Sequence, residues 1–239
     1  MKTGKHFRLH PDDVLSKKYR VLDLLGEGWE SEVYLVEEIS TGVPRAAKLF
    51  FPKRNLKNKT LIQNAKKLYQ LRSCPLLIQY FSHETTLISG VEVDYMISDY
   101  VQSQTLEDLL KKQSRKAFTQ FEALHIVYEL AKGLEIIHAS KDYHGDLHSG
   151  NILIKRKGLK FDIKLIDFHN QPGAKKDLIK EDIVDLIHIL YEILGGKKRY
   201  KLLRPEVKSI IMAKRRTSIL KKFPKISDLK VYLENLEWT

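Results

Sequence analysis

Two carboxylates and one carboxamide form the most specific chemical pattern in this sequence. Asp146 is followed five positions later by Asn151, which opens a run of strand-forming residues, and a second such run ends at Asp167. The Asp-x4-Asn spacing suits a tight loop that aims a carboxylate at a substrate hydroxyl and an amide oxygen at a metal ion. Asp167, at the end of the next strand, would hold a metal that bridges two phosphates. The pattern therefore predicts phosphoryl transfer.

The residues around this pattern give it a family resemblance. The stretch His144-Gly145-Asp146-Leu147-His148 resembles the catalytic loop of the protein-kinase superfamily, where most members have His-Arg-Asp. This resemblance implies ATP and Mg²⁺ as cofactors, Asp146 as the catalytic base, and Asn151 and Asp167 as magnesium ligands. His148 stands where protein kinases usually carry a lysine near the γ-phosphate, and a histidine there can still donate a hydrogen bond to the transferring phosphate.

A glycine-containing hairpin lies near the amino terminus. Strand formers at 19–25 and 32–36 flank Gly26-Glu27-Gly28-Trp29-Glu30-Ser31. Glycines at a hairpin tip let backbone N–H groups approach phosphates, because no Cβ stands in the way. The segment resembles the kinase glycine-rich loop, with Ser31 in place of the third glycine. The resemblance implies that Gly26, Gly28 and Ser31 bind the cofactor and that Val33 covers the nucleotide base.

Lys48 is the basic residue that the resemblance assigns to the nucleotide phosphates. It lies in the predicted strand 44–51 among apolar neighbours, where a lysine needs a partner. The family places a glutamate on the following helix to pair with this lysine. Here the predicted helix 56–72 has none, because the sequence carries no Asp or Glu between Glu38 and Glu84.

Other side chains could take the place of that missing glutamate. Gln63 and Asn64 are the best-placed polar residues of the predicted helix, and either could hydrogen-bond Lys48 without neutralising it. An acid from elsewhere is the other alternative, and the candidates are Asp167, Glu30 and Glu32.

The remaining predicted cofactor contacts also follow from the resemblance. Alignment with the family's hinge would place backbone groups of Asp99 to Val101 next to adenine and would put Ser98 at the gatekeeper position. Ala46 and Leu153 complete the predicted cofactor-binding residues.

The carboxyl-terminal half reads as helical. Apolar residues repeat at helical spacing over 118–140, directly before the catalytic loop. The segment 182–196 resembles the family's central buried helix, with Asp182 bracing the catalytic loop. It begins so soon after Asp167 that the usual activation segment is essentially deleted, and Gly145 replaces the arginine that grips a phosphorylated activation loop. Two or three helices are expected beyond Gly196, the last over 226–236.

Composition fits a globular protein of the cytoplasm. The chain has 239 residues, of which 43% are hydrophobic and 30% charged. It contains no apolar run long enough to cross a membrane and no apolar signal segment at its amino terminus. The single cysteine, Cys74, rules out an internal disulfide and is typical of a reducing compartment.

The net charge of +12 is unevenly distributed. Lysines and arginines crowd residues 197–225, where Glu206 is the single acid, and a second basic run covers 53–67. Such patches attract acidic or phosphate-bearing partners, and the alternative is a solvated surface of exposed lysines.

The sequence thus predicts an α+β, bilobal protein-kinase-like fold. The expected divisions are a leader at 1–18, a β-rich N-lobe at 19–98 and a helical C-lobe at 99–239. The leading functional hypothesis is an atypical Ser/Thr protein kinase that acts on a hydroxyl of a protein rather than of a small molecule and is not controlled by activation-loop phosphorylation. The alternatives are a small-molecule kinase of the aminoglycoside or choline phosphotransferase type, and a pseudokinase scaffold that binds an acidic partner through its basic C-terminal face.

Overall fold

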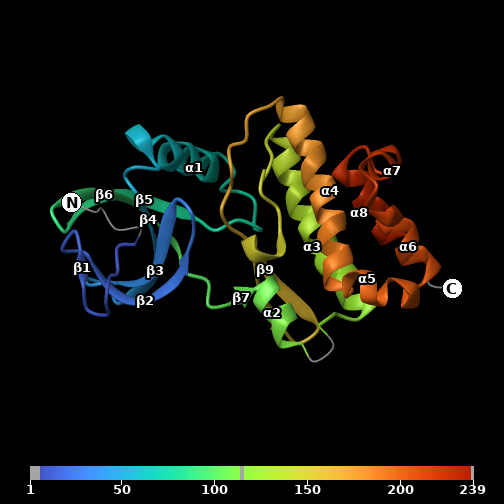
Figure 1. The fold of residues 1–239 in the computed structure, drawn as a ribbon, viewed down its shortest axis with the longest axis horizontal. Helices are drawn as coiled ribbons and strands as arrows, with labels where there is room; N and C mark the ends of the chain where they lie inside the picture. Colours follow the sequence, from blue (N-terminus) through green and yellow to red (C-terminus); the bar gives the residue numbers. More distant parts are fainter. Residues whose placement is uncertain (1–5, 114–115, 238–239) are drawn as a thin grey trace. The chain divides into compact units, whose positions relative to one another are not determined.

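The computed structural model describes residues 6–113 and 116–237, and the chain divides into two compact units. The first comprises residues 1–73 and 78–101, and the second comprises 74–77 and 102–239. The first is built mainly of strands and the second mainly of helices (Figure 1), which confirms the α+β fold class. The sequence placed the division between residues 98 and 99, whereas the contacts place it after Val101 and assign Cys74–Leu77 to the second unit.

The first unit is an antiparallel sheet of six strands in the order β1-β2-β3-β4-β6-β5. A short 3₁₀ turn, η1 (Leu56–Asn58), leads into its helix, α1 (Lys59–Gln70). The helix expected over 56–72 is therefore shorter by one turn, because Lys57 and Asn58 have positive φ angles. The strands are β1 (Val14–Leu15), β2 (Tyr19–Glu27), β3 (Ser31–Glu38), β4 (Val43–Phe50), β5 (Tyr80–Ile88) and β6 (Val91–Asp99).

Alternation along the strands decides which residues of this sheet form the core. Ala47 and Leu49 of β4 lie in one buried cluster with Val93, Tyr95 and Ile97 of β6. Successive side chains of a strand point to opposite faces, so the intervening residues belong to the other face of the sheet.

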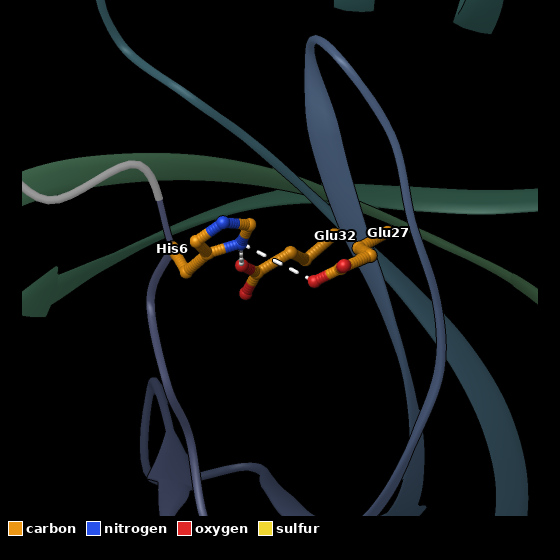
Figure 2. Close-up of side chains that lie close together, drawn as sticks. All are labelled: His6, Glu27 and Glu32. Atoms are coloured by element: carbon orange, nitrogen blue, oxygen red, sulfur yellow. Dashed lines mark hydrogen bonds and ion pairs between the residues drawn. The ribbon is translucent and has the colours of Figure 1, made fainter.

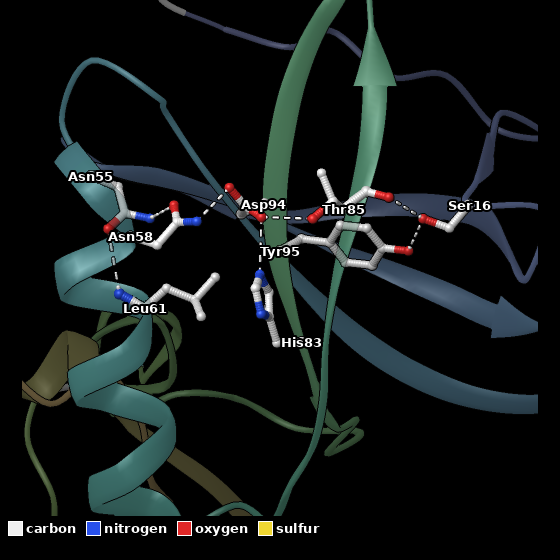
Figure 3. A network of polar contacts seen from close by, with 8 residues as sticks. All are labelled: Ser16, Asn55, Asn58, Leu61, His83, Thr85, Asp94 and Tyr95. Atoms are coloured by element: carbon white, nitrogen blue, oxygen red, sulfur yellow. Dashed lines mark hydrogen bonds and ion pairs between the residues drawn. The ribbon is translucent and has the colours of Figure 1, made fainter.

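The described part of the leader packs on the core face. Phe7 and Leu9 pack against the buried cluster, and β1 pairs with β2. The Ser16 hydroxyl accepts a hydrogen bond from Tyr95 and donates one to the carbonyl of Thr85 (Figure 3). The leader is therefore an integral part of the first unit from His6 onward.

The second unit holds a three-stranded sheet and seven helices among its described residues. Side chains cap the starts of α2 and α3: Thr105 caps α2, and Thr119 with Glu122 forms a capping box at α3. In the described chain after Gly196, α6, α7 and α8 agree with the expectation of two or three helices, and α5 is an additional single turn that begins at Gly196 itself; 3₁₀ turns at Tyr200–Leu202 and Met212–Lys214 divide this region. The elements are β7 (Gln104–Thr105), α2 (Leu106–Lys112), α3 (Gln120–Ala139), η2 (Ser149–Asn151), β8 (Ile152–Lys157), β9 (Lys160–Leu165), α4 (Lys175–Ile193), α5 (Gly196–Arg199), η3 (Tyr200–Leu202), α6 (Pro205–Ile211), η4 (Met212–Lys214), α7 (Arg216–Lys222) and α8 (Ile226–Glu234).

Helices α3 and α4 form the centre of this unit. They pack on each other along buried aliphatic faces, and α3 also contacts α8. The chain between α3 and β8 forms the predicted catalytic loop, and the chain between β9 and α4 contains Asp167. The first segment leaves α3 directly, and the second leads directly into α4. No helix among the described residues is long and apolar enough to span a membrane.

Candidate active site

A buried carboxylate of α4 holds the start of the loop at 143–151. Asp182 is fully buried, and its two oxygens accept hydrogen bonds from the backbone amides of His144 (2.7 Å) and Gly145 (3.0 Å). The same carboxylate lies 3.0 Å from Nε2 of His138 on α3. A buried charge is tolerated when it is paired and hydrogen-bonded, and these three contacts satisfy that condition. The structure thus contains the brace that the family resemblance implied.

Three predicted site residues come together at the end of this loop. The Asn151 amide nitrogen donates to the main-chain carbonyl of Asp146 (2.9 Å) and to its carboxylate (3.1 Å). Nε2 of His148 lies 3.7 Å from the same carboxylate. The Asp146 side chain is 51% exposed and so remains open to a substrate. Because the nitrogen of Asn151 is committed to Asp146, its oxygen is the atom left to ligate a hard cation such as Mg²⁺.

Gly145 is required by the shape of the loop. Its φ is +85°, and a Cβ at this position would collide with the carbonyl of His169 and lie 2.8 Å from the Tyr143 ring. Residues other than glycine rarely adopt such a backbone conformation. Gly145 therefore occupies this position for a steric reason, and the usual family arginine would not fit here.

The segment that follows Asp167 folds back on the loop. The amide of His169 donates to the carbonyl of His144 (3.1 Å), and the Gln171 side chain donates to the carbonyl of Gly145 (2.5 Å). The Tyr143 hydroxyl in turn donates to the carbonyl of Gln171 (3.3 Å). Helix α4 begins at Lys175, so residues 168–174 are the whole connection. Asp167 itself has a φ of +58°, a strained conformation that is common at functional sites.

The glycine hairpin of the first unit has an accessible backbone. The Gly28 amide donates to the carbonyl of Ser31 (2.9 Å), which closes a tight turn between β2 and β3. A Cβ added at Gly26 would meet nothing within 4 Å, and one added at Gly28 would meet only the Ser31 carbonyl at 3.8 Å. The hairpin therefore leaves open space beside its glycines, as close approach of a ligand to the backbone requires.

Strand register brings three predicted cofactor residues to one face of the sheet. Val33 of β3 lies opposite Lys48 of β4, which lies opposite Met96 of β6. Ala46, two residues before Lys48, lies opposite Ser98. Directly opposed residues in a sheet share a face, so Val33, Ala46 and Lys48 line the face opposite the core cluster. Lys48 is buried, with 8% of its surface exposed.

Glu32 lies on the core face of the sheet, where it contacts the leader and not Lys48. It pairs in register with Leu49, so it points away from the Lys48 face, and its proposed pairing with Lys48 is wrong. Its carboxylate accepts hydrogen bonds from the Phe7 amide (3.2 Å) and the Tyr34 hydroxyl (2.5 Å) and lies 3.0 Å from Nδ1 of His6. Burial raises the pKa of Tyr34, and the hydrogen bond to Glu32 raises it further.

Among the described residues, one group of side chains has the ligand types and spacing of a metal site: His6, Glu27 and Glu32 (Figure 2). One ligand atom from each lies within 4.8 Å of the others. Both oxygens of Glu32 already accept hydrogen bonds from protein groups. These contacts therefore connect the leader to the hairpin.

The remaining predicted residues are placed as follows. Asp99 ends β6; its amide donates to the carbonyl of Gln79, and its carboxylate accepts from the Gln79 amide. Val101 is the last residue of the first unit, and Leu153 lies half-buried in β8. On α1, Gln63 is exposed, whereas Asn64 is buried and its side-chain oxygen has no hydrogen-bond partner among the described residues. The Asn64 oxygen therefore accepts no hydrogen bond from Lys48, which rules out that alternative for Asn64.

Two features of the first unit are not predicted by the sequence. Lys67 is buried on α1, although it was counted only as part of a basic run. Its spacing of three residues from Asn64, which itself lies three residues after Leu61, could have placed it beside the buried face. Asp94 anchors the start of α1 through Asn58 (2.7 Å), and no sequence pattern indicates this contact across 36 residues.

Comparison with known proteins agrees with this geometry. A sequence model described as a protein kinase domain matches residues 19–200. The chain is 25% identical over 206 residues to the probable serine/threonine-protein kinase YbdM of Bacillus subtilis, covering 78% of this chain and 74% of that protein. It is 28% identical over 203 residues to the serine/threonine-protein kinase pkn2 of Myxococcus xanthus, covering 78% of this chain and 21% of the other. Calcium-dependent protein kinase 4 of Plasmodium falciparum is 27% identical over 193 residues, with coverages of 77% and 34%.

The chain thus spans about three quarters of one of these relatives and a third or less of the other two. The family match covers most of the present sequence, including the glycine hairpin, Lys48, the Asp146–Asn151 pair and Asp167. A loop braced by a buried aspartate, with a carboxylate and a carboxamide in contact at its end, is what the family's chemistry requires. The chain belongs to the protein kinase family.

Proposed function

We propose that this protein is an atypical serine/threonine protein kinase that transfers the γ-phosphate of ATP to a hydroxyl group of a protein. The similarity to serine/threonine-protein kinases of Bacillus and Myxococcus supports the choice of serine or threonine. The observation that carries the proposal is the contact between Asp146 and Asn151 on a loop braced by Asp182. This contact holds a proton acceptor and a metal-binding oxygen side by side.

Each predicted residue has a role in this reaction. ATP with Mg²⁺ would supply the transferable phosphoryl group. Asn151 and Asp167 offer the oxygen ligands that Mg²⁺ prefers, and Lys48 offers a charge for the phosphates. Asp146 accepts the proton of the acceptor hydroxyl, since its carboxylate is exposed and oriented by Asn151.

His148 has a supporting role in the same loop. Its Nδ1 accepts a hydrogen bond from the Gly150 amide (3.1 Å), which leaves Nε2 to act as a donor. Nε2 lies on the side of Asp146, so it can donate to the phosphate during transfer.

The short connection after Asp167 supports independence from activation-loop phosphorylation. His169 and Gln171 hydrogen-bond residues 168–174 to the catalytic loop. This loop has Gly145 at the position where regulated kinases carry the arginine that binds the phosphate of the activation loop. Treatment with a phosphatase should therefore leave the rate unchanged. A large loss of rate would contradict this part of the proposal.

The decisive experiment measures ATP consumption by the purified protein with Mg²⁺, beside Asp146→Ala and Asp167→Ala. We expect phosphorylation of a protein acceptor, or self-phosphorylation, that both variants lose by at least about 100-fold. Binding of ATP without turnover against a broad acceptor set would favour a pseudokinase. Turnover with small alcohols but not with proteins would favour a small-molecule kinase.

The basic region 197–225 is proposed to bind an acidic or phosphate-bearing partner. Lys197, Lys198 and Lys201 are exposed there, and cations clustered on a surface attract such partners. Arg216 is already paired with Glu181 at 2.5 Å, so part of the charge serves the fold.

A further inference from the structure

Helix α1 has an outward face on which lysines and apolar side chains alternate. Lys59, Ile62, Lys66 and Tyr69 follow one another at spacings of three, four and three residues, which places them on one side of the helix. Ile62 is 42% exposed and Tyr69 is 60% exposed, and both lysines are exposed as well. The buried residues of α1 lie on its other side, so the fold leaves this face to the solvent.

An exposed leucine stands at the amino-terminal end of this face. Leu56 lies in η1, directly before α1, and is 71% exposed, although leucine is among the residue types most often buried. The next residue, Lys57, is also exposed. We use the name α1 surface for the residues Leu56, Lys57, Lys59, Ile62, Lys66 and Tyr69.

Side-chain hydrogen bonds hold the turn that carries this leucine. Asn55 is buried, and its side-chain oxygen accepts hydrogen bonds from the amides of Thr60 (3.1 Å) and Leu61 (3.4 Å). Its side-chain nitrogen donates to Asn58 (3.2 Å), which in turn donates to Asp94 of β6 (2.7 Å) (Figure 3). The exposed leucine is therefore presented by a turn that is anchored to the sheet.

Protein acids do not neutralise the charge of the α1 surface. The sequence has no Asp or Glu between Glu38 and Glu84. Within residues 6–113 and 116–237, none of the ion pairs involves Lys57, Lys59 or Lys66. The three ammonium groups are therefore available to an anionic partner.

The alternation of charge and apolar groups fits a membrane surface better than a protein surface. The centre of a protein–protein interface is depleted of lysine, whereas lysines separate the apolar residues of the α1 surface. At a bilayer, apolar side chains enter the boundary between headgroups and acyl chains, and lysine stems extend so that their ammonium groups stay among the lipid phosphates. Anionic lipids add an attraction for each lysine.

We propose that the α1 surface binds the surface of an anionic membrane. Helix α1 lies along the bilayer, its exposed apolar side chains enter the headgroup region, and its exposed lysines contact lipid phosphates. The inference goes beyond phosphoryl transfer, because none of these residues is assigned to ATP or to the phosphate acceptor.

The first test measures sedimentation of the protein with vesicles. One set contains equal parts of phosphatidylcholine and phosphatidylglycerol, and the other contains phosphatidylcholine alone. We expect binding to the anionic vesicles only, and this binding should weaken as salt is added. Replacement of Lys57, Lys59 and Lys66 by glutamine should weaken it by about 100-fold, since each lysine near an anionic bilayer contributes about fivefold.

Matched variants test the charge and the apolar contribution separately. Replacement of Lys197, Lys198 and Lys201 by glutamine removes the same charge from exposed positions elsewhere, and it should weaken binding by no more than about threefold. Leu56→Gln should weaken binding by at least about fivefold, because the leucine would otherwise leave water. Leu159→Gln changes a leucine of the second unit that is 91% exposed, and it should have no effect.

The other outcomes overturn the proposal in distinct ways. Equal losses in the two lysine variants would show that net charge, and not the α1 surface, attracts the bilayer. Binding to polyglutamate but not to anionic vesicles, lost in the α1 variant, would make an acidic protein the partner. Binding to neither would show that the surface is only solvated. None of these outcomes bears on the proposed phosphoryl transfer.

A second measurement uses the wild-type protein and so does not depend on folding of a variant. A water-soluble acetylating reagent converts exposed lysine amines to amides, and peptide mapping then compares samples with and without anionic vesicles. We expect vesicles to protect Lys57, Lys59 and Lys66 and to leave Lys197 and Lys198 reactive. Protection of Lys197 and Lys198 alone would overturn the inference.

Discussion

Gly145 shows how one backbone angle decides which residue a catalytic loop can contain. At this backbone conformation, the amides of His144 and Gly145 both donate hydrogen bonds to Asp182. The His169 carbonyl and the Tyr143 ring occupy the space that a side chain at position 145 would need. The amino-acid type is therefore dictated by packing around the loop.

Gly145→Ala should destabilise the protein and abolish turnover. We expect a loss of about 2–4 kcal/mol in the free energy of unfolding, from backbone strain and the collision with the His169 carbonyl. Gly158→Ala is the matched control, because Gly158 also has a positive φ (+61°) but open space around it. It should cost only about 1 kcal/mol. Equal losses in urea denaturation would show that strain alone matters at Gly145.

Asp185 is a second residue whose surroundings make a definite prediction. Burial raises the pKa of its carboxyl to about 7, and the neighbouring Asp182, Glu181 and Asp146 charges add to the effect. The folded protein thus binds a proton more tightly than the unfolded chain, whose aspartate titrates near pH 4. Stability contributed by this proton is complete below about pH 4 and is lost as the pH rises to about 7.

Asp185→Asn should remove this dependence. The melting temperature of the variant should exceed that of the wild type at pH 8, and the difference should shrink at pH 5. Asp177→Asn, an exposed position on the same helix, should leave the pH dependence as it is in the wild type. A wild-type melting temperature that rises steadily from pH 5 to pH 8 in step with Asp185→Asn would contradict the prediction.

At the scale of elements, the leader and the glycine hairpin form one assembly. The leader contacts the hairpin at Glu32, beside its turn, and Phe7 stacks on Phe51 with ring centroids 4.9 Å apart. The space beside the turn glycines is open, whereas Glu27 and Glu32 next to the turn both contact His6 of the leader.

Glu32→Gln should loosen this assembly. An amide cannot form the ion pair with His6 and must place a donor nitrogen against either the Phe7 amide or the Tyr34 hydroxyl. We expect faster hydrogen exchange at residues 7–9 and 31–34. Glu27→Gln, which removes only an exposed contact with His6, is the control. Protection that is identical in both variants would show that the leader is held by its aromatic contacts.

The elements also show how far sequence alone could lead. The family resemblance was enough to predict that Val33, Ala46 and Lys48 belong to one site, and they lie on one face of the sheet. The helical spacing of apolar residues was enough to predict the helix over 118–140, which spans Gln120–Ala139. Contacts between distant segments were out of reach. The hydrogen bond from the Phe7 amide to Glu32 joins residues that are 25 positions apart. The clash that excludes a side chain at Gly145 comes from the carbonyl of His169.

At the scale of the whole molecule, the most prominent property is the net positive charge. The chain carries +12 at neutral pH, and residues 197–225 hold a large share of it in α5 to α7. Because surface charges are screened by salt, binding that depends on them must weaken as ionic strength rises.

Replacement of Lys197, Lys198 and Lys201 by serine should weaken binding of inorganic polyphosphate. The slope of log affinity against log salt should become shallower by about one for each lost contact with phosphate. The control replaces three exposed lysines of β8 and β9, Lys155, Lys157 and Lys160, and removes the same net charge. Equal effects in fluorescence titration would mean that net charge, and not the basic region, attracts the polyanion.

The shape of the loop at Gly145 also bears on how this protein could change over evolutionary time. An ancestor or descendant with arginine at this position would need a different backbone angle, and therefore different positions for Tyr143 and His169. A single change to arginine would therefore destabilise the fold, and arginine could enter this position only together with changes at Tyr143 and His169.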